Sequence, residues 1–256
     1  EELSQLLQLV PVPVMPGTFS SEYDVDPERP EHGTTHLVTM DSEGNIVTLT
    51  TSIEDNFGSG IVVPGRGFFL NNHMTDFSYN AYGSGRAYAN GIKGGLAPRR
   101  AALGADKLTS GGQRPRSSMS PTIVLRPDGT PVIAIGTPGG SRIIGTVFNA
   151  LVSMIDSGLS LKDAVDKPRA IGRNGAAWLE DMDQCQCPYP ALYSNQELMQ
   201  ELHQRGMATA SMATPRPYTY MEGIYVHSNG TVEAYADINR MPTSYARVVH
   251  PARHGV

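Results

Sequence analysis

The stretch Glu31-His32-Gly33-Thr34-Thr35-His36 lies where the character of the chain changes, and the rest of the sequence is arranged around it. It ends a segment rich in proline and acidic residues, and a region with the two-residue period of β-strands follows. Cleavage of the Gly33–Thr34 bond would give Thr34 a free α-amine beside its own hydroxyl, which is a recognised way to activate a threonine nucleophile. A simple turn leading into a strand explains the same residues, so both interpretations stay open at this point.

The composition excludes several classes of protein. The chain has 256 residues, 39% hydrophobic and 18% charged, which is enough apolar material for a sizeable core and is not typical of disorder. Its net charge of −5, with no long run of one sign, argues against nucleic acid as a main partner. No apolar run approaches membrane-spanning length. We expect Cys185 and Cys187 to be free thiols, because no second pair completes a zinc site and a disulfide between such close neighbours is strained.

Residues 1–33 are expected to form a strap on another surface. After a short helix-like piece at 3–10, prolines prevent regular helix over most of the segment; they are Pro11, Pro13, Pro16, Pro27 and Pro30. The chain does not start with Met and no signal-peptide pattern follows Glu1, so we expect a processed product, a trimmed chain or part of a longer precursor.

Strand patterns after residue 34 come in pairs. Alternating apolar and polar residues predict three hairpins, at 36–41 with 46–52, 122–125 with 132–135, and 221–226 with 232–236. A further short strand is predicted at 68–70. In the first hairpin we expect Val47 and Leu49 to face the core and the hydroxyl side chains to face away.

Helical spacing predicts three helices between these hairpins. They cover residues 143–155, the segment from the capping box at Ser160 to a point before Pro168, and the segment from the capping box at Ser194 to Gly206. Residues 78–116 lack a period and form a long loop that could cover a site, and 178–192 are expected to be irregular. Antiparallel pairs with helices between them indicate a layered α+β fold.

Several polar or glycine-rich positions are candidates for chemistry, and each has a plainer explanation. Gly139-Gly140 follows a strand and precedes a helix, so its amides could stabilise an oxyanion or merely make a tight turn. Ser117 and Ser118 could hold a substrate carboxylate or could initiate a turn. Asp76 could bind an ammonium group or cap a turn. His36 and His73 are interpreted as structural residues.

Five segments in this order and approximate spacing resemble gamma-glutamyltranspeptidases. They are Gly33-Thr34-Thr35-His36, Phe57-Gly58-Ser59-Gly60, Asn71-Asn72 through Asp76-Phe77, Pro115 through Thr122, and Thr137 through Ile143. The resemblance implies an N-terminal nucleophile hydrolase fold, an αββα sandwich of antiparallel sheets between helical layers, produced by self-cleavage of a precursor. It implies that residues 1–33 are the tail of the large subunit and residues 34–256 the catalytic small-subunit domain.

The resemblance also implies catalytic roles. Thr34 matches the nucleophile, and Ser52 falls where the family has a threonine whose hydroxyl lies close to it. Gly139 and Gly140 match the amides of the oxyanion hole.

Five further positions match residues that bind the donor substrate. Asp76 matches the acid that binds the glutamyl α-ammonium, and Ser117 and Ser118 match the pair that holds the α-carboxylate. Glu54 stands where better-known members have Asn, and His73 where they have Gln or Glu, so the donor substrate is open. The 78–116 segment is also longer than in the bacterial type members.

The predicted function is therefore a gamma-glutamyl transferase or hydrolase that cleaves gamma-glutamyl amides such as glutathione through an acyl-enzyme on Thr34. Two alternatives remain: a related acylase of the cephalosporin, glutaryl or poly-gamma-glutamate type, and an uncleaved, catalytically silent homologue. No metal or cofactor is expected. The expected partners are a gamma-glutamyl substrate and the large subunit from the same precursor, and the resemblance implies a periplasmic, secreted or cell-surface location.

Overall fold

The computed structural model describes residues 33–76, 114–173, 176–180, 192, 195–211 and 219–249. The helix-like piece at 3–10, both cysteines and most of the long loop at 78–116 lie outside these residues. In the described part of the chain, no helix has both the length and the apolar character that crossing a membrane requires.

Strands and helices follow one another largely as the sequence predicts. The strands are β1 (Thr34–Met40), β2 (Ile46–Ser52), β3 (Thr122–Leu125), β4 (Pro131–Gly136), β5 (Ala170–Arg173), β6 (Ala176–Leu179), β7 (Ala208–Ser211), β8 (Glu222–Val226) and β9 (Val232–Ala236). The helices are α2 (Ile143–Ile155), α3 (Leu161–Asp166) and α4 (Gln196–Gln204), with short 3-10 turns η1 (His73–Asp76) and η4 (Gly140–Arg142).

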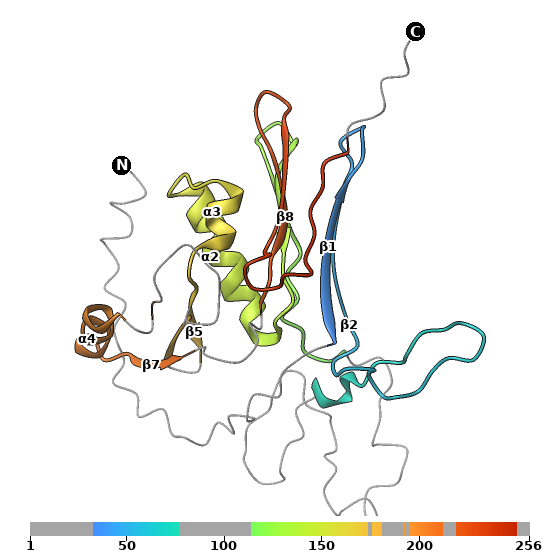
Figure 1. Cartoon of the computed structure of the whole chain (residues 1–256), viewed down its shortest axis with the longest axis horizontal. Coiled ribbons are helices and arrows are strands. Elements are labelled where there is room, and N and C mark those ends of the chain that lie inside the picture. Colours follow the sequence, from blue (N-terminus) through green and yellow to red (C-terminus); the bar gives the residue numbers. More distant parts are fainter. Residues whose placement is uncertain are drawn as a thin grey trace, which may run out of the picture.

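These elements form layers, which Figure 1 shows edge-on. The central layer is an antiparallel sheet with the strand order β3-β4-β8-β9. Helices α2 and α3 pack against one of its faces, and the β1–β2 hairpin packs against the other. In the described residues, a helical layer thus covers one of two facing sheets, while β5, β6 and β7 form a separate sheet; this is a layered α+β architecture.

The core lies between the central sheet and the helices. The buried apolar residues of α2 form one cluster with Ile133 and Ile135 of β4 and Met221 just before β8; on the helix they are Ile143, Val147, Ala150 and Met154. Only part of the stripe predicted from helical spacing forms this contact: Ile143 and Val147 are buried, whereas the predicted members Ile144, Phe148 and Ile155 are exposed. Helix α3 begins as predicted, because the Ser160 side chain accepts a hydrogen bond from the Asp163 amide.

The prediction for the inward face of the first hairpin is wrong. Val47 and Leu49 are exposed, while the side chains of Thr34, His36 and Thr50 are buried against the central sheet. His36 explains this orientation, because its ring lies against Gly136 of β4: a Cβ added to Gly136 would come within 2.1 Å of the His36 Cε1 atom. Only a glycine lets the imidazole reach this position, so the polar face turns inward.

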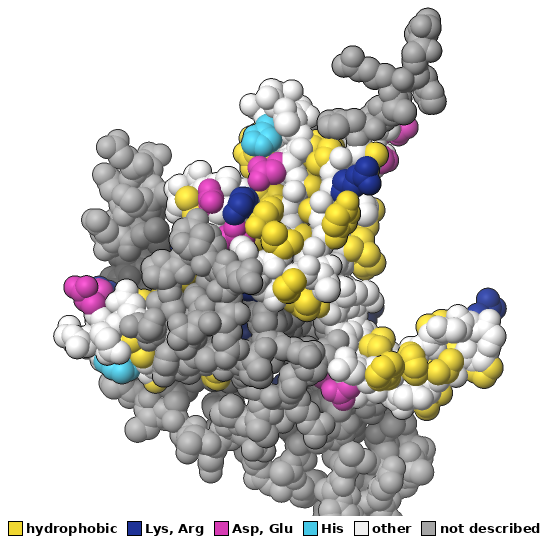
Figure 2. All heavy atoms as spheres, in the orientation of Figure 1, with side chains coloured by type: hydrophobic (Ala, Val, Ile, Leu, Met, Phe, Trp, Pro, Cys, Tyr) yellow, Lys and Arg dark blue, Asp and Glu magenta, His cyan; other side chains and the backbone are white. Residues whose placement is uncertain are grey.

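The outward face of the hairpin is consequently apolar and uncovered by the described residues. Figure 2 shows apolar side chains gathered over β1, β2 and the loop that follows them. The exposed ones are Leu37, Val47, Leu49, Phe57, Ile61, Val62, Phe68 and Leu70. A contiguous apolar surface of this kind is typical of a face that another polypeptide layer covers.

Three smaller predictions need correction. Residues 178–192 are not wholly irregular, because Trp178 and Leu179 belong to β6, which pairs with β5 and, in parallel, with β7. The cap of α4 is Asn195 and not Ser194, since the Asn195 side chain accepts from the Leu198 amide. The strand predicted at 68–70 is a single bridge between Val62 and Phe69.

A buried network of ionic groups ties the end of the chain to this core. Arg169 Nη2 lies 2.6 Å from Asp237 Oδ2, and Arg240 contacts Asp237 at 3.1 Å and Glu180 at 2.7 Å. Burial alone would raise the pKa of Glu180. The hydrogen bonds from Arg240 and the charges of the two guanidinium groups outweigh burial and lower this pKa below its ordinary value, so the carboxylate stays ionised. The segment after β9 is thereby fixed across α3 and β6.

Candidate active site

The register of the first hairpin brings two hydroxyls together. Thr34, the first residue of β1, lies opposite Ser52, the last residue of β2. The Thr34 Oγ1 hydroxyl donates a hydrogen bond to Ser52 Oγ at 2.9 Å, and Ser52 Oγ also accepts from the Glu54 amide at 3.1 Å. Thr34 is therefore held at a strand end, with its hydroxyl oriented by a neighbour that is itself anchored.

The peptide unit before Thr34 is fixed by the backbone after β2. The Gly33 carbonyl accepts a hydrogen bond from the Ile53 amide at 2.9 Å, and the Gly33 amide donates to the Glu54 carbonyl at 3.1 Å. No side chain fits here, because a Cβ on Gly33 would lie 2.6 Å from the Glu54 oxygen. Self-cleavage would begin with attack of the Thr34 hydroxyl on the Gly33 carbonyl carbon. The hydrogen bond from the Ile53 amide polarises this carbonyl.

His36 sits beneath this strand end and is structural, as the sequence suggests. Its Nδ1 atom lies 2.8 Å from Thr50 Oγ1 and its Nε2 atom 3.2 Å from Thr48 Oγ1. Burial lowers the pKa of His36 to about 4, so the ring is neutral at physiological pH.

The Gly139-Gly140 turn follows β4 and begins η4. Both glycines have positive φ angles, 131° and 55°, which side chains rarely adopt. The Ser118 hydroxyl donates a hydrogen bond to the Gly140 carbonyl at 2.6 Å. One of the two serines predicted to bind a carboxylate is thus hydrogen-bonded to the turn predicted to form the oxyanion hole. The Ser117 hydroxyl instead accepts from the Met119 amide at 3.2 Å.

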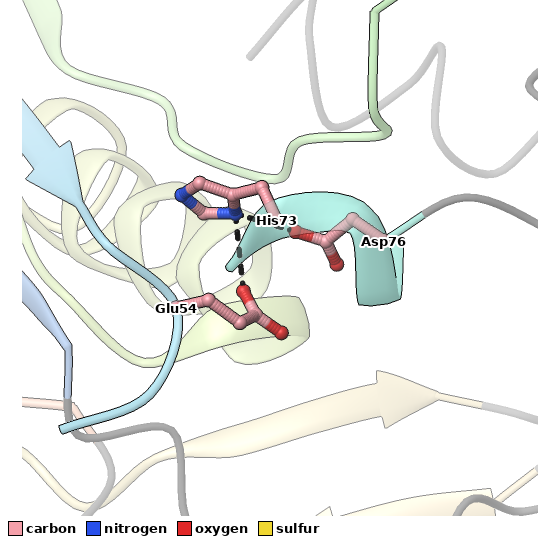
Figure 3. A group of neighbouring side chains, drawn as sticks. All are labelled: Glu54, His73 and Asp76. Atoms are coloured by element: carbon pink, nitrogen blue, oxygen red, sulfur yellow. Dashed lines mark hydrogen bonds and ion pairs between the residues drawn. The ribbon is translucent and has the colours of Figure 1, made fainter. Parts of the chain in front are cut away.

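Glu54, His73 and Asp76 form the second part of the site (Figure 3). His73 Nδ1 lies 2.8 Å from Asp76 Oδ2 and 3.2 Å from Glu54 Oε2, and His73 Nε2 lies 3.1 Å from the Ser52 carbonyl oxygen. Glu54 has a φ angle of 75°, an uncommon value outside glycine that turns the chain sharply after β2. Backbone strain of this kind is concentrated at functional sites.

The His73 ring nitrogens contact carboxylate and carbonyl oxygens, which accept hydrogen bonds and so favour the protonated ring. Burial lowers the pKa of His73, but the hydrogen bond to Asp76, the Ser52 carbonyl and the charges of Asp76 and Glu54 together raise it above the ordinary value. The three ligand atoms lie within 4.8 Å of one another, so the spacing alone would also suit a metal ion. An imidazolium satisfies both carboxylates and the carbonyl without one.

The structure thus links most of the predicted site residues into two groups. One runs from Thr34 through Ser52 to Glu54, His73 and Asp76, and the other joins Ser118 to the Gly140 turn. They lie at the ends of β2 and β4, which pack against each other from facing sheets. Ser117 makes a local turn contact and is not drawn into either group.

Two features of the site carry no recognisable signal in the sequence. The Ile53 amide is a backbone group, so its residue type says nothing of its role. Tyr220, whose hydroxyl lies 3.5 Å from the Thr34 backbone oxygen, comes from the far end of the chain. Only the packing of β1 against β8 brings it near.

Most of this chain is similar in sequence to one known protein family. A family model described as gamma-glutamyltranspeptidase matches residues 13–246. A glutathione hydrolase proenzyme of Pseudomonas sp. (strain A14) is 39% identical over 154 residues, which cover 57% of this chain and 24% of the relative. The chain accordingly spans about a quarter of the length of the curated relatives it matches.

Solved structures resemble a larger share of the chain. A mutant gamma-glutamyltranspeptidase of Pseudomonas nitroreducens is 29% identical with a TM-score of 0.61, covering 85% of this chain and all of that one. An acivicin-inhibited gamma-glutamyltranspeptidase is 28% identical with a TM-score of 0.60, covering 81% and 99%. The latter structure is described as showing roles for its C-terminus in autoprocessing and catalysis.

Proposed function

The chain belongs to the gamma-glutamyltranspeptidase family and has its α+β hydrolase fold, and on that premise we propose that residues 34–256 form the catalytic part of a self-cleaving gamma-glutamyl transferase or hydrolase. The proposal rests mainly on the hydrogen bonds at the Gly33–Thr34 junction. There, a threonine hydroxyl is bound to Ser52 while the preceding carbonyl accepts a hydrogen bond from the Ile53 amide. The Ile53 contact continues the β1–β2 ladder, so what goes beyond a plain strand start is the Thr34 hydroxyl bound to Ser52 next to that polarised carbonyl.

Self-cleavage uses these contacts first. The Thr34 hydroxyl oxygen attacks the Gly33 carbonyl carbon, and the Ile53 amide stabilises the negative charge that develops on the carbonyl oxygen. The Gly33–Thr34 C–N bond breaks, the amine takes up a proton, and Gly33 is left as an ester on Thr34. Water then hydrolyses that ester and leaves residues 1–33 as the tail of the preceding subunit and Thr34 with a free α-amine.

The mature site repeats the same chemistry on the substrate. The α-amine of Thr34 takes the proton of its hydroxyl as the oxygen attacks the gamma-glutamyl carbonyl carbon. The Gly139 and Gly140 amides stabilise the oxyanion, the departing amine takes up a proton, and a gamma-glutamyl ester forms on Thr34. Water or an amino-acid or peptide amine resolves the ester. No step requires a metal or an organic cofactor.

The donor's α-carbon substituents are bound on either side of this ester. Ser117 and Ser118 hold the α-carboxylate, for which the Ser118 hydroxyl turns from the Gly140 carbonyl to the substrate. Asp76, with Glu54, holds the α-ammonium through charge-assisted hydrogen bonds. The curated relatives carry the name glutathione hydrolase, which supports a glutathione-like gamma-glutamyl amide as the donor.

A large subunit from the same precursor completes the fold. The apolar outward face of β1 and β2 is the part of the αββα sandwich that no described helix covers. Relatives named as proenzymes support the view that the covering layer comes from the same polypeptide. Size-exclusion chromatography coupled to mass spectrometry of the material expressed from the full precursor tests this, since a fully active species containing only residues 34–256 would contradict it.

One observation favours a second function. Glu54 stands where better-known family members have Asn, and His73 where they have Gln or Glu, at positions that the resemblance places around the donor's α-amine; this change is compatible with an acylase for a donor lacking that amine. Hydrolysis rates of a gamma-glutamyl anilide and a glutaryl anilide decide between the two functions. Thr34→Ala should abolish both activities, while Thr35→Ala, which alters an exposed neighbour on the same strand, should retain them.

A further inference from the structure

His73 occupies the place where the donor's ammonium group would bind. Its Nδ1 atom contacts Asp76 and Glu54, the same two carboxylates that the proposed function assigns to the α-ammonium. In the protonated ring, the Nδ1–H group donates to the oxygens that an ammonium needs. A second cation between the same oxygens would meet the imidazolium at hydrogen-bond distance, which is strongly unfavourable.

The neutral ring presents the opposite situation. Its Nε2–H group remains bound to the Ser52 carbonyl at 3.1 Å, which fixes the tautomer and leaves the Nδ1 lone pair directed toward the carboxylates. Nδ1 and one oxygen each from Glu54 and Asp76 then form three acceptors within 4.8 Å of one another. An ammonium group carries three N–H donors, so it can satisfy all three acceptors at once.

The surrounding charges do not remove this competition. Asp76 Oδ1 also lies 3.7 Å from the Nε atom of Arg116, whose side chain is two-thirds exposed, and Asp55 is bound to Asn72 beside Glu54. The imidazolium is therefore the cation in direct contact with both carboxylates, while Arg116 lies farther from Asp76 and Asp55 is engaged with Asn72. An added ammonium therefore binds well only when a proton leaves.

We propose that His73 makes recognition of the donor's α-amine depend on pH, because the site accepts an α-ammonium only when the His73 ring is neutral. This inference rests on the proposed function and deepens it. The substrate's ammonium and the proton on Nδ1 exclude each other, so donors with an α-amine are favoured at higher pH. Acyl donors without an α-amine are insensitive to the exchange.

The test is the ratio of kcat/KM for a gamma-glutamyl anilide to that for a glutaryl anilide, measured on the mature enzyme between pH 5 and 7.5. Titration of the Thr34 α-amine affects both donors alike and cancels in the ratio. The wild-type ratio should fall about tenfold for each pH unit below the pKa of His73, because only the neutral fraction binds the amine. In His73→Gln, which keeps an N–H donor but does not titrate, the ratio should be flat.

A flat ratio in the wild type, or a slope that persists in both His73→Gln and His73→Asn, overturns the proposal. Failure of the proposed function looks different, because then neither anilide is hydrolysed or hydrolysis survives Thr34→Ala. A wild-type ratio that changes on addition of EDTA would also overturn it, by showing that a metal ion occupies the cluster.

A binding measurement checks the same exchange without turnover. Calorimetry of L-glutamate binding near pH 6.5, in two buffers with different heats of ionisation, should show proton release by the wild type. The same enzyme should release no proton with glutarate, and His73→Gln should release none with L-glutamate. Binding of L-glutamate to the wild type without proton release contradicts the exchange.

Discussion

The buried His36 ring makes the hairpin that carries Thr34 sensitive to acid. Burial lowers the pKa of His36 from 6.5 to about 4, and among the described residues the ring nitrogens form hydrogen bonds only with the uncharged hydroxyls of Thr48 and Thr50. A depressed pKa means that the unfolded chain binds a proton before the folded chain does. The contribution to stability is therefore complete above pH 6.5 and is lost as the pH falls toward 4.

The size of this effect follows from linkage between protonation and folding. With these two pKa values, the free energy of unfolding should fall by about 2 kcal/mol between pH 8 and pH 5 on account of His36 alone. Other groups titrate in the same range; burial, for example, raises the pKa of Glu222 to about 8. The quantity to measure is therefore the difference in unfolding free energy between the wild type and His36→Gln, from urea titrations at both pH values.

The glutamine variant retains a donor and an acceptor but cannot take up a proton in this range. We expect it to be less stable than the wild type at pH 8, because the packing against Gly136 is altered. That deficit should shrink by about 2 kcal/mol at pH 5. A stability difference that stays constant from pH 8 to pH 5 would refute the reasoning and would mean that His36 is not held neutral by burial.

Three further substitutions test other parts of the structure. Ser52→Ala removes the hydroxyl that accepts a hydrogen bond from Thr34 and should lower kcat about tenfold, the effect of losing one hydrogen bond of roughly 1.4 kcal/mol. Thr51→Ala, on the exposed face of the same strand, is the control and should have little effect in the same assay. Gly136→Ala places a methyl group within 2.1 Å of the His36 ring and should cost about 1–3 kcal/mol of unfolding free energy, seen as a lower urea midpoint; unchanged stability would show that the ring does not rest on this glycine. Asp237→Asn leaves the buried guanidinium of Arg169 without its carboxylate and should destabilise the protein by about 3–5 kcal/mol, so a thermal melt close to that of the wild type would argue against the network.

The sequence was sufficient to predict elements whose stability is local. The bounds of α2 and the Ser160 cap of α3 can be recognised without knowing the fold, and both are as predicted, whereas the period did not show which apolar residues of α2 face the sheet. The four-residue strands β6 and β7 could not be found, because their pairing with each other joins segments about thirty residues apart and neither has a clear period.

The orientation of the first hairpin illustrates a different limit. The alternation of Val47 and Leu49 with polar residues predicts one buried face, but both side chains are exposed among the described residues. The alternating pattern was interpreted correctly as a strand, but the prediction of which face lies against the core of this chain was wrong. The inward turn of His36 could not be foreseen, because it depends on a glycine in β4 a hundred residues away.

For the site, the family resemblance identified Thr34, Ser52, Glu54, His73 and Asp76 at separate points of the chain. Their roles stay predictions, but the structure shows most of them joined by hydrogen bonds. What the sequence could not supply was the charge state of His73, because that depends on which atoms surround its two ring nitrogens. The role of a backbone group such as the Ile53 amide cannot be predicted from the sequence either, because every residue except proline has the same amide.

The central claim, that Thr34 becomes an N-terminal nucleophile, is tested most directly by the intact mass of the purified precursor and its Thr34→Ala variant. The account predicts that the wild type separates into two polypeptides, the second beginning at Thr34, and that the variant stays whole and inactive. An uncut wild type that hydrolyses gamma-glutamyl anilide at full rate would contradict it.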